Sequence, residues 1–421
     1  MNLHQKTPSL FFHDYGGHAF TAQLARAMSR RGYAVTYASS NEFGTPKGRV
    51  QGRETDPEQF RAIGISVGER FDKQNLVKRQ RQQARYATVA AEAMRRARPG
   101  LVVSSNAPLE VQKRLLDACN ATGAGFVFWM QDIHSEAIAR ILSRRSPTLG
   151  WLAGRYYERL EKGLLARSDA VVTIADEFVD LVGARGWGLD ADRISVIENW
   201  APLEDLPPCR RDNDWARRHF RLERRNIVYS GTLARKHDPE ILVRLAQELD
   251  ADVHLFSEGA GAEHVEQRRK ELKLGNLFVR SWVTVDELPL MLAGADVLTA
   301  FIEKDAGAFS VPSKVLSYLS AGRPILASIP AGNLATRTIR GADAGLVSEP
   351  GDHESMIENA RRLIDNPALR QRLGANGRAY AERTFDIERI AGRFEEVFAR
   401  VGSGARPFHL RTADQTPDDA N

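Results

Sequence analysis

The chain has 421 residues, of which 43% are hydrophobic and 27% are charged, and this globular composition excludes a disordered chain, a collagen-like fibre and a coiled-coil rod. The formal net charge is +5, from 59 Lys and Arg residues against 54 Asp and Glu residues, an excess too small for a dedicated nucleic-acid-binding protein. It fits phosphate-bearing ligands or an anionic membrane surface, while the two cysteines, Cys119 and Cys209, cannot form a disulfide framework.

The length predicts two domains, because single hydrophobic cores stop growing near ~250–300 residues. The first eight residues are polar and lack the apolar stretch of a secretory signal. No run of about 18 apolar residues occurs, so no segment is expected to span a bilayer. We therefore expect a cytoplasmic protein that contacts a membrane, if at all, from the cytoplasmic face, and that has no nucleic-acid partner.

The first half of the chain opens with a buried strand, a glycine turn and a helix. Residues 9–13 form an apolar run, Gly16 and Gly17 follow it, and Leu24, Ala27 and Met28 then share a helix face that ends at Gly32. Residues 33–37 read as the next strand. Further strands are predicted at residues 101–103, 126–129 and 170–173, each separated by a helical pattern.

The second half repeats this order about two hundred residues later. Residues 226–230 read as a strand, Gly231 interrupts it, a helical pattern follows through residues 241–249, and residues 253–256 form the next strand. Further strands are predicted at residues 276–279, 296–299 and 324–327. Strand, glycine turn, helix and strand form the opening of a parallel βαβ unit, and its double occurrence predicts an α/β fold with two Rossmann-like domains.

The predicted boundaries follow from composition. A proline-containing segment at residues 199–214 reads as a linker, which separates an N-terminal domain of residues 1–200 from a C-terminal domain of residues 201–385. A helix at residues 386–401 carries an apolar stripe that must be buried, and we expect it to pack back on the N-terminal domain. The polar tail of residues 402–421 is expected to be disordered.

Each half of the chain has a glycine-containing loop directly after its first strand. Open parallel sheets bind ligands at this end of their strands. Gly16 and Gly17 allow a close approach of the backbone to an anion at a helix start, although a tight turn explains them equally well. The second loop combines Gly231 and Thr232 with Arg235 and Lys236, which suits a diphosphate better than a merely solvated loop.

Two further segments carry polar candidates. Around residues 310–324, Ser310 or Ser313 can cap a short helix, Pro312 suits its first turn, and Gly322 ends it. The start of this helix, with Lys314, would face the cleft and could bind a phosphate, or these residues could serve only to cap the helix. After the strand at residues 126–129, Asp132 and His134 enter a predicted loop, where either could orient a hydroxyl or handle a proton, or could be structural.

Metal-binding motifs are not found in the sequence. There is no His-Glu-x-x-His motif and no cysteine cluster, and the acidic pair at residues 212 and 214 lies in the predicted linker. We predict neither a metal nor a cofactor.

Basic and aromatic residues gather in the first half. Basic residues lie at 78, 79, 81 and 85 on one predicted helix, and Arg144, Arg145 and Arg155 accompany Trp151, Tyr156 and Tyr157. Cations beside amphipathic aromatic rings suit a lipid headgroup surface, and an ordinary exposed helix face is the alternative.

The ordered set of motifs resembles the GT-B glycosyltransferases of family 4, in the branch that builds surface polysaccharides. The resemblance covers about residues 8–400. It rests on segments at residues 16–17, 24–25, 31–35, 172–178, 194–200, 229–233, 256–259, 286–289, 294–297 and 312–324.

The resemblance implies two Rossmann-like domains that face each other across a cleft, with the acceptor on the N-terminal domain and the nucleotide on the C-terminal domain. It implies retaining transfer of a sugar from a UDP- or GDP-linked donor to a lipid-linked or oligosaccharide acceptor, without a bound metal. Arg235 or Lys236 would neutralise the leaving diphosphate together with Ser313 and Lys314. Gly17 would approach the donor, and Asp132 and His134 would meet the sugar or acceptor.

One feature departs from the family pattern. Many members carry a Glu-x7-Glu motif whose second carboxylate binds ribose, and the aligned residues here are Phe309 and Ser317. Glu303, Ser317 and Trp282 remain as nucleotide or ribose candidates. Two alternatives stay open, namely an epimerase or hydrolase of the same fold and a non-catalytic protein that binds nucleotide sugars.

Overall fold

The computed structural model describes residues 9–42, 48–69, 71, 76–143, 146–233, 238–304 and 311–403. The chain divides into two compact units. Unit 1 comprises the chain up to Glu198 and from Ile387 onward, and unit 2 comprises Asn199–Asp386. Each unit is described by itself below.

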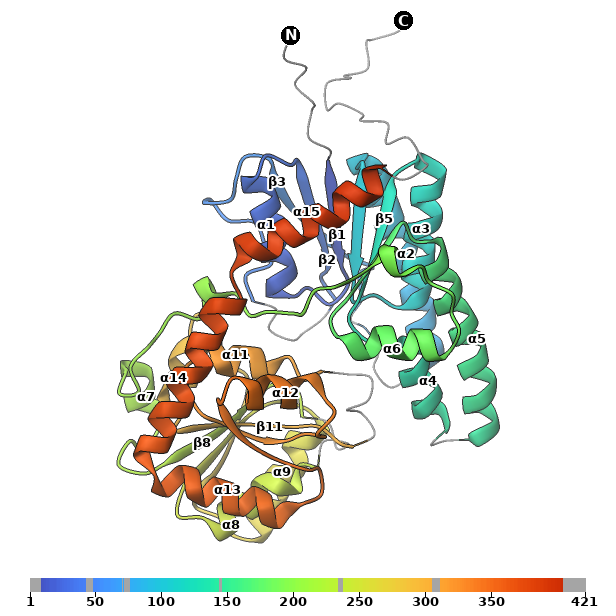
Figure 1. The fold of residues 1–421 in the computed structure, drawn as a ribbon. Coiled ribbons are helices and arrows are strands. Elements are labelled where there is room, and N and C mark those ends of the chain that lie inside the picture. Colours follow the sequence, from blue (N-terminus) through green and yellow to red (C-terminus); the bar gives the residue numbers. More distant parts are fainter. Residues whose placement is uncertain are drawn as a thin grey trace, which may run out of the picture. The chain divides into compact units, whose positions relative to one another are not determined.

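Unit 1 is built on a parallel sheet of seven strands in the order β3-β2-β1-β4-β5-β6-β7, with helices packed along it (Figure 1). The strands are β1 (Leu10–Asp14), β2 (Val35–Ser40), β3 (Phe60–Ile65), β4 (Leu101–Ser105), β5 (Gly125–Met130), β6 (Ala170–Thr173) and β7 (Ile194–Val196). The helices are α1 (Ala19–Arg30), α2 (Leu76–Ala97), α3 (Leu109–Thr122), α4 (His134–Ser143), α5 (Pro147–Arg167), α6 (Asp176–Ala184) and α15 (Ile387–Ser403), and a 3-10 turn spans Ala191–Arg193.

Unit 2 repeats the design with six parallel strands in the order β10-β9-β8-β11-β12-β13. They are β8 (Asn226–Ser230), β9 (Asp252–Phe256), β10 (Leu277–Arg280), β11 (Val297–Phe301), β12 (Ile325–Ser328) and β13 (Gly345–Ser348). The helices are α7 (Asp214–His219), α8 (Glu240–Glu248), α9 (Ala260–Glu271), α10 (Leu288–Gly294), α11 (Lys314–Ser320), α12 (Leu334–Gly341), α13 (His353–Asp365) and α14 (Pro367–Thr384), and a 3-10 turn spans Leu203–Asp205.

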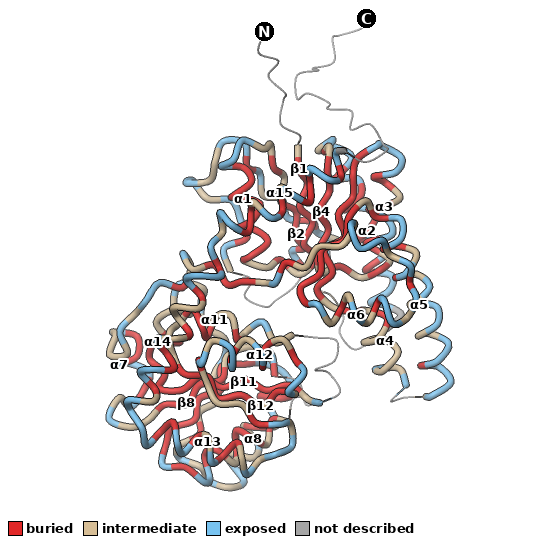
Figure 2. The backbone as a smooth tube through the Cα atoms, in the orientation of Figure 1, coloured by how far each residue is buried: buried red, intermediate tan, exposed pale blue. Residues whose placement is uncertain are grey.

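The central strands form because their side chains are buried on both faces of a sheet. Every residue of β1, β4, β5, β9 and β11 is buried, and Figure 2 shows both sheets as the most buried part of their units. Such continuous apolar runs are typical of parallel sheets that are covered by helices. The two predicted Rossmann-like folds are thereby confirmed.

Three strands were not predicted, and all three lie at an edge of a sheet. They are β3, β7 and β13, and their residues are largely half-buried or exposed. An edge strand has one neighbour and less cover, so its sequence lacks the unbroken apolar run that marked the central strands.

The predicted linker contains short helical structure. The 3-10 turn at Leu203–Asp205 lies inside it, and α7 begins at its last residue, Asp214.

Helix α15 packs on the sheet of unit 1. The Phe398 ring lies 6.5 Å from the Phe12 ring, and the Phe394 ring lies 4.8 Å from the Trp129 ring. Arg31 next to α1 forms ion pairs with Glu388 and Glu395 on α15. The apolar stripe of this helix is therefore buried against β1 and β5.

No helix in the described parts of the chain is both long enough and apolar enough to cross a membrane.

Candidate functional site

In unit 2, the loop after β8 meets the start of α11 at the carboxyl edge of the sheet. Gly231 has a φ of +127°, a conformation that side chains other than hydrogen rarely adopt. A Cβ atom on Gly231 would lie 3.4 Å from Cε and 3.5 Å from Nζ of Lys314. Two predicted residues that are distant in the sequence are thus brought together, and the positive φ, more than the space beside Lys314, favours glycine at this position.

A hydrogen-bonded chain holds Lys314 in this position. Its Nζ lies 3.6 Å from the centre of the Tyr229 ring and donates a hydrogen bond to the Tyr229 hydroxyl. The Tyr229 hydroxyl in turn donates to the carbonyl oxygen of Thr232 at 2.9 Å. On the next turn of α11, the Tyr318 hydroxyl accepts a hydrogen bond from the Ser230 N–H at 3.0 Å. The two tyrosines therefore tie α11 to the loop after β8.

Lys314 is half-buried as a residue, its ammonium group is buried, and no carboxylate of the described residues forms an ion pair with it. Burial lowers the pKa of its ammonium to about 7, because a charged group loses its hydration there. A phosphate oxygen at this position would supply the missing negative charge. The geometry therefore suits an anion that binds beside Gly231 and Lys314.

The start of α11 differs in detail from the prediction. Ser313 occupies the N-cap position, but its side chain makes no capping hydrogen bond, so the predicted side-chain cap is wrong for this residue. Pro312 lies before the helix rather than in its first turn, because α11 begins at Lys314. The alternative cap, Ser310, lies outside the described residues. The exposed Ser313 hydroxyl therefore has no capping role.

The predicted cations Arg235 and Lys236 lie outside the described residues. The described chain stops at Leu233, whose N–H donates to the Ser257 hydroxyl oxygen at 3.1 Å, and it resumes at Asp238. The loop that carries both cations therefore begins and ends at the carboxyl edge of this sheet.

The nucleotide candidates do not gather in one place. Glu303 follows β11 and lines a cavity of about 300 Å³ together with Asp238 and His353, which form an ion pair of 2.7 Å. Ser317 on α11 and Trp282 after β10 are half-buried, and neither lines this cavity. Phe309 lies outside the described residues.

In unit 1, the loop after β1 is organised by a buried carboxylate. Asp14 accepts hydrogen bonds from the N–H of Gly17 at 3.0 Å, from the N–H of His18 at 2.5 Å and from Nδ1 of His18 at 2.9 Å. Burial by itself would raise the pKa of Asp14, but the charge of His18 and these hydrogen bonds lower it overall. Gly17 has a φ of +70°, and a Cβ on Gly16 would lie 2.2 Å from the His18 ring.

The His18 ring is fixed from two sides. Nδ1 lies 2.9 Å from Asp14 on one side, and Nδ2 of Asn106 lies 3.0 Å from Nε2 on the other. Asn106 directly follows β4, which pairs with β1 in a register that sets Asp14 opposite Ser105. The imidazole remains about one third exposed, so the hydroxyl group of a ligand can reach it. His18 and Asn106 were not among the predicted site residues, although each follows a predicted strand.

The predicted loop after β5, with its candidates Asp132 and His134, is partly helical. His134 is the first residue of α4 rather than part of a loop, and its N–H donates to the buried Glu161 carboxylate at 3.0 Å. Ser135 donates to the same carboxylate through its N–H and its hydroxyl. Nδ1 of His134 is buried, has no hydrogen-bond partner and lies 3.9 Å from Glu161. Glu161 therefore anchors the start of α4, and Asp132 lies half-buried just before it.

No cluster of three or more His, Cys, Asp or Glu side chains suited to a metal ion occurs within the residues that the structure covers.

Two protein-family models match the chain. The model described as "Glycosyl transferase 4-like domain" matches residues 15–200, and the one described as "Glycosyl transferases group 1" matches residues 224–366. The chain belongs to the GT-B glycosyltransferases. The resemblance to family 4 is confirmed by these matches, which include the loops after β1 and β8.

Two curated relatives are also glycosyltransferases. The MMP α-(1→4)-mannosyltransferase of Mycolicibacterium hassiacum is 28% identical over 38% of this glycosyltransferase, and the match covers 39% of the relative, less than half of its length. The lipopolysaccharide core biosynthesis glycosyltransferase LpsD of Rhizobium meliloti is 26% identical over 59% of this chain and 68% of its own length.

Solved structures share the fold across nearly the whole glycosyltransferase. Sucrose-phosphate synthase from Thermosynechococcus elongatus has a TM-score of 0.72 at 16% identity and covers 94% of this chain and 99% of its own. Anabaena HepE, solved in complex with UDP and glucose, has a TM-score of 0.66 at 14% identity, with coverage of 93% and 99%. These similarities show the GT-B fold.

Proposed function

We propose that this glycosyltransferase moves a sugar from a UDP- or GDP-linked donor to a lipid-linked or oligosaccharide acceptor, with retention of the anomeric configuration. The observation that carries the proposal is Lys314, a buried ammonium without a carboxylate partner among the described residues, held beside Gly231 at the carboxyl edge of a Rossmann-like sheet. Ligands of such sheets bind at this edge. The UDP complex of HepE, a protein of the same fold, supports a nucleotide donor.

The proposed chemistry is stabilisation of a leaving diphosphate by fixed cations. The departing group develops negative charge as the bond to the sugar breaks, and preorganised donors stabilise that charge without reorganisation. We assign this role to Lys314, with Arg235 and Lys236 from the loop after β8, and assign Ser313, Gly231 and Thr232 to diphosphate binding. These groups would act without a bound metal. Unchanged turnover after dialysis against EDTA supports that part of the proposal, and loss of turnover that Mg²⁺ or Mn²⁺ restores contradicts it.

The roles of unit 1 are proposed on the same basis. We assign acceptor binding to this unit, with Gly16 and Gly17 approaching the donor and with Asp132 and His134 near the sugar or acceptor. The name of the relative LpsD supports a role in surface polysaccharide synthesis. The fixed, partly exposed imidazole of His18 adds one group that can bind a sugar or acceptor hydroxyl.

The experiment measures release of UDP or GDP from a panel of nucleotide sugars, with and without a panel of lipid-linked acceptors. Acceptor-dependent release supports the proposal, and an NMR spectrum of the product gives the anomeric configuration. Conversion of the donor in the absence of any acceptor identifies an epimerase or hydrolase instead. Binding of a nucleotide sugar without turnover on any acceptor identifies a non-catalytic protein.

We further propose that the enzyme contacts the cytoplasmic face of a membrane through α4 and α5. Six large hydrophobic side chains are exposed among the described residues, and five of them lie on or just before these two helices. They are Ile141, Leu149, Trp151, Leu152 and Tyr156, of which Trp151 is 59% exposed. Arg155 lies over the Trp151 ring at 5.2 Å. Apolar and aromatic side chains interleaved with arginine suit anionic headgroups.

Cosedimentation with lipid vesicles tests this surface. We expect binding to vesicles that contain phosphatidylglycerol and much weaker binding to pure phosphatidylcholine. The double variant Trp151→Ser and Leu152→Ser should lose binding, whereas Val89→Ser, which removes an exposed apolar side chain from α2, should not. Equal loss in both variants, or no binding by the wild type, contradicts the proposal.

A further inference from the structure

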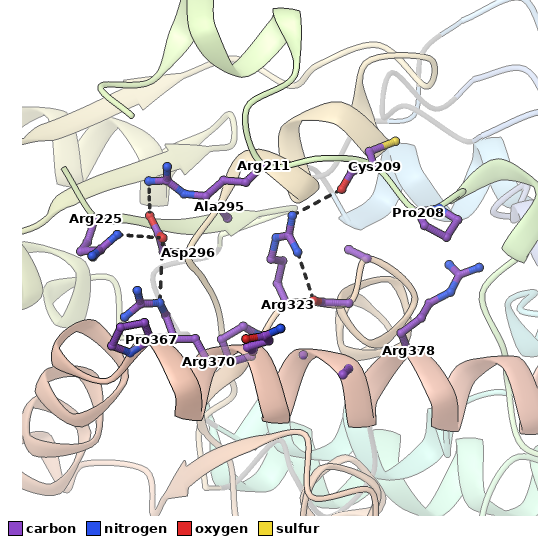
Figure 3. A pocket seen from close by; sticks show the side chains of 16 residues that line it. Pro208, Cys209, Arg211, Arg225, Ala295, Asp296, Arg323, Pro367, Arg370 and Arg378 are labelled. Atoms are coloured by element: carbon purple, nitrogen blue, oxygen red, sulfur yellow. Dashed lines mark hydrogen bonds and ion pairs between the residues drawn. The ribbon is translucent and has the colours of Figure 1, made fainter. Parts of the chain in front are cut away.

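A cavity of about 490 Å³ lies at the amino edge of the sheet of unit 2, opposite to the edge that carries Lys314. It is bounded by residues that precede β8, β11 and β12, by the segment from Pro208 to Arg211 and by α14. Figure 3 shows arginine side chains around it from the segment at Arg211, from the residues before β8 and β12 and from α14, whereas the residues before β11 contribute Asp296. The cavity is therefore separate from the proposed donor site.

Five arginines line this cavity, and only one carboxylate does. The arginines are Arg211, Arg225, Arg323, Arg370 and Arg378. The carboxylate is Asp296, which is almost fully buried and lies 2.7 Å from Arg211, 3.7 Å from Arg225 and 3.9 Å from Arg370. One negative charge is thus shared among three guanidinium groups (Figure 3).

Helix ends offset part of the remaining positive charge. Arg370 donates to the carbonyl oxygens of Leu363 and Ile364 at the end of α13. Arg378 donates to the carbonyl oxygen of Ser320, the last residue of α11, and pairs with the half-exposed Glu382. A helix carboxyl end carries only about half of an elementary negative charge. Five guanidinium groups line the cavity and only one lining carboxylate faces them, so an excess of positive charge remains there.

Arg323 shows this excess most directly. Its guanidinium donates to the carbonyl oxygens of Ala293, Gly322 and Cys209, and no carboxylate of the described residues lies within 4.0 Å of it. Burial lowers its pKa, as expected for a cation that is incompletely compensated. Close by, the buried Nε of Arg211 has no hydrogen-bond partner. Arg323 is half-buried, and a partly buried guanidinium without a carboxylate partner is stabilised when an anion binds beside it.

We propose that this arginine cavity binds a small phosphate-bearing anion at the amino edge of the sheet. Guanidinium groups bind phosphate oxygens in a bidentate manner, and an anionic phosphate would offset the excess positive charge. The volume admits more than a bare phosphate, so the source is either inorganic phosphate or the phosphate group of a sugar phosphate. The inference does not depend on the proposed function, because the cavity lies away from the donor site.

The first test measures thermal unfolding of the full chain at constant ionic strength, with inorganic phosphate or with glucose 1-phosphate as the probe. A ligand that binds only the folded protein raises its stability, and we expect a rise in Tm of roughly 5 °C at a hundredfold excess over Kd. The rise should persist in saturating UDP, since UDP is assigned to the opposite edge of the sheet. A larger rise with glucose 1-phosphate identifies a sugar phosphate as the source.

The second test places a carboxylate at the rim of the cavity. Gln371 is exposed on α14 and lines the cavity, so Gln371→Glu should raise Tm without phosphate and weaken phosphate binding at least tenfold. Gln247→Glu on the exposed side of α8 makes the same charge change elsewhere and should leave phosphate binding unchanged. Arg225→Gln should also weaken binding, and Arg225 is exposed enough that the fold should tolerate the change.

Three outcomes would overturn the inference. They are the absence of any phosphate-dependent rise in Tm, a rise that saturating UDP abolishes, and equal effects of Gln371→Glu and Gln247→Glu. The second of these outcomes would place the phosphate in the donor site.

Discussion

The loops after β1 and β8 occupy equivalent places in two similar sheets, yet they differ in charge. The loop after β1 contains its own anion, since the buried Asp14 carboxylate accepts the hydrogen bonds of Gly17 and His18. The loop after β8 lies beside a cation instead, since Lys314, the first residue of α11, contacts Gly231 and has no carboxylate partner in the described structure. The first loop thus has its own negative charge, whereas a bound diphosphate at the second loop is our proposal. If that proposal is right, similar strand–glycine–helix elements serve two purposes that differ in the sign of one charge.

The largest expected effect comes from removing that cation. Lys314→Ala should lower kcat/KM by roughly 100- to 1000-fold, the range observed when one preorganised donor to a developing anion is lost. Steady-state kinetics with the preferred donor measure the effect. Lys270→Ala, which removes an exposed lysine from α9, should leave kcat/KM unchanged. A loss of less than threefold for Lys314→Ala would show that the loop after β8 does not depend on this charge.

Replacing the buried Asp14 carboxylate of the loop after β1 should lower the stability of the protein and leave nucleotide binding unchanged. Asp14→Asn removes the charge that fixes three hydrogen bonds, and we expect a loss of roughly 2–3 kcal/mol in the free energy of unfolding. Because the pKa of Asp14 lies below its ordinary value of 3.8, this contribution is complete above that pH and is lost only on acidification below it. Denaturant unfolding and UDP titration of the same variant measure both quantities. Weaker UDP binding with unchanged stability would contradict the comparison.

Replacing Gly231 or Gly17 by alanine should have smaller effects, and the two variants form a matched pair. Gly231→Ala places a side chain at a φ of +127°, and it should weaken UDP binding by roughly tenfold because the loop must change its backbone conformation beside Lys314. Gly17→Ala should cost about 1 kcal/mol of stability, since its φ is also positive, with UDP binding unchanged. Calorimetric titration of UDP and thermal unfolding of both variants provide the comparison. Equal effects on UDP binding would show that the two loops do not differ in role.

Much of the fold could be predicted from the sequence because the central strands contain apolar runs that are buried on both faces. Residues 9–13 and 226–230 were recognisable as strands for this reason, and the glycines after them marked the ligand-binding edge. The edge strand Phe60–Ile65 could not be recognised, because its residues are exposed in part and resemble a loop.

The predicted site was less complete because its contacts join distant parts of the chain. Gly231 and Lys314 could be proposed from their places after strands, but the Tyr229 hydroxyl that positions Lys314 lies 85 residues away from it. His18 and Asn106 are 88 residues apart and meet only because β1 pairs with β4. Side-chain chemistry alone does not reveal such pairs, since the register of the sheet decides them.

The smallest expected effect is a pH dependence of nucleotide binding that arises from the titration of Lys314 beside the loop after β8. Since the pKa of Lys314 is about 7 in the free protein, its ammonium is largely charged at pH 6 and largely neutral at pH 8. A bound diphosphate favours the charged form, so UDP affinity should fall about fivefold between pH 7 and pH 8. UDP itself is nearly fully ionised in this range, because the second pKa of a phosphate is about 6. Lys314→Ala should therefore bind UDP weakly and with little pH dependence between pH 7 and pH 8, whereas Asp14→Asn should retain the wild-type fall. An equal fall in Lys314→Ala would assign the titrating group to another residue and would separate the anion site from this lysine.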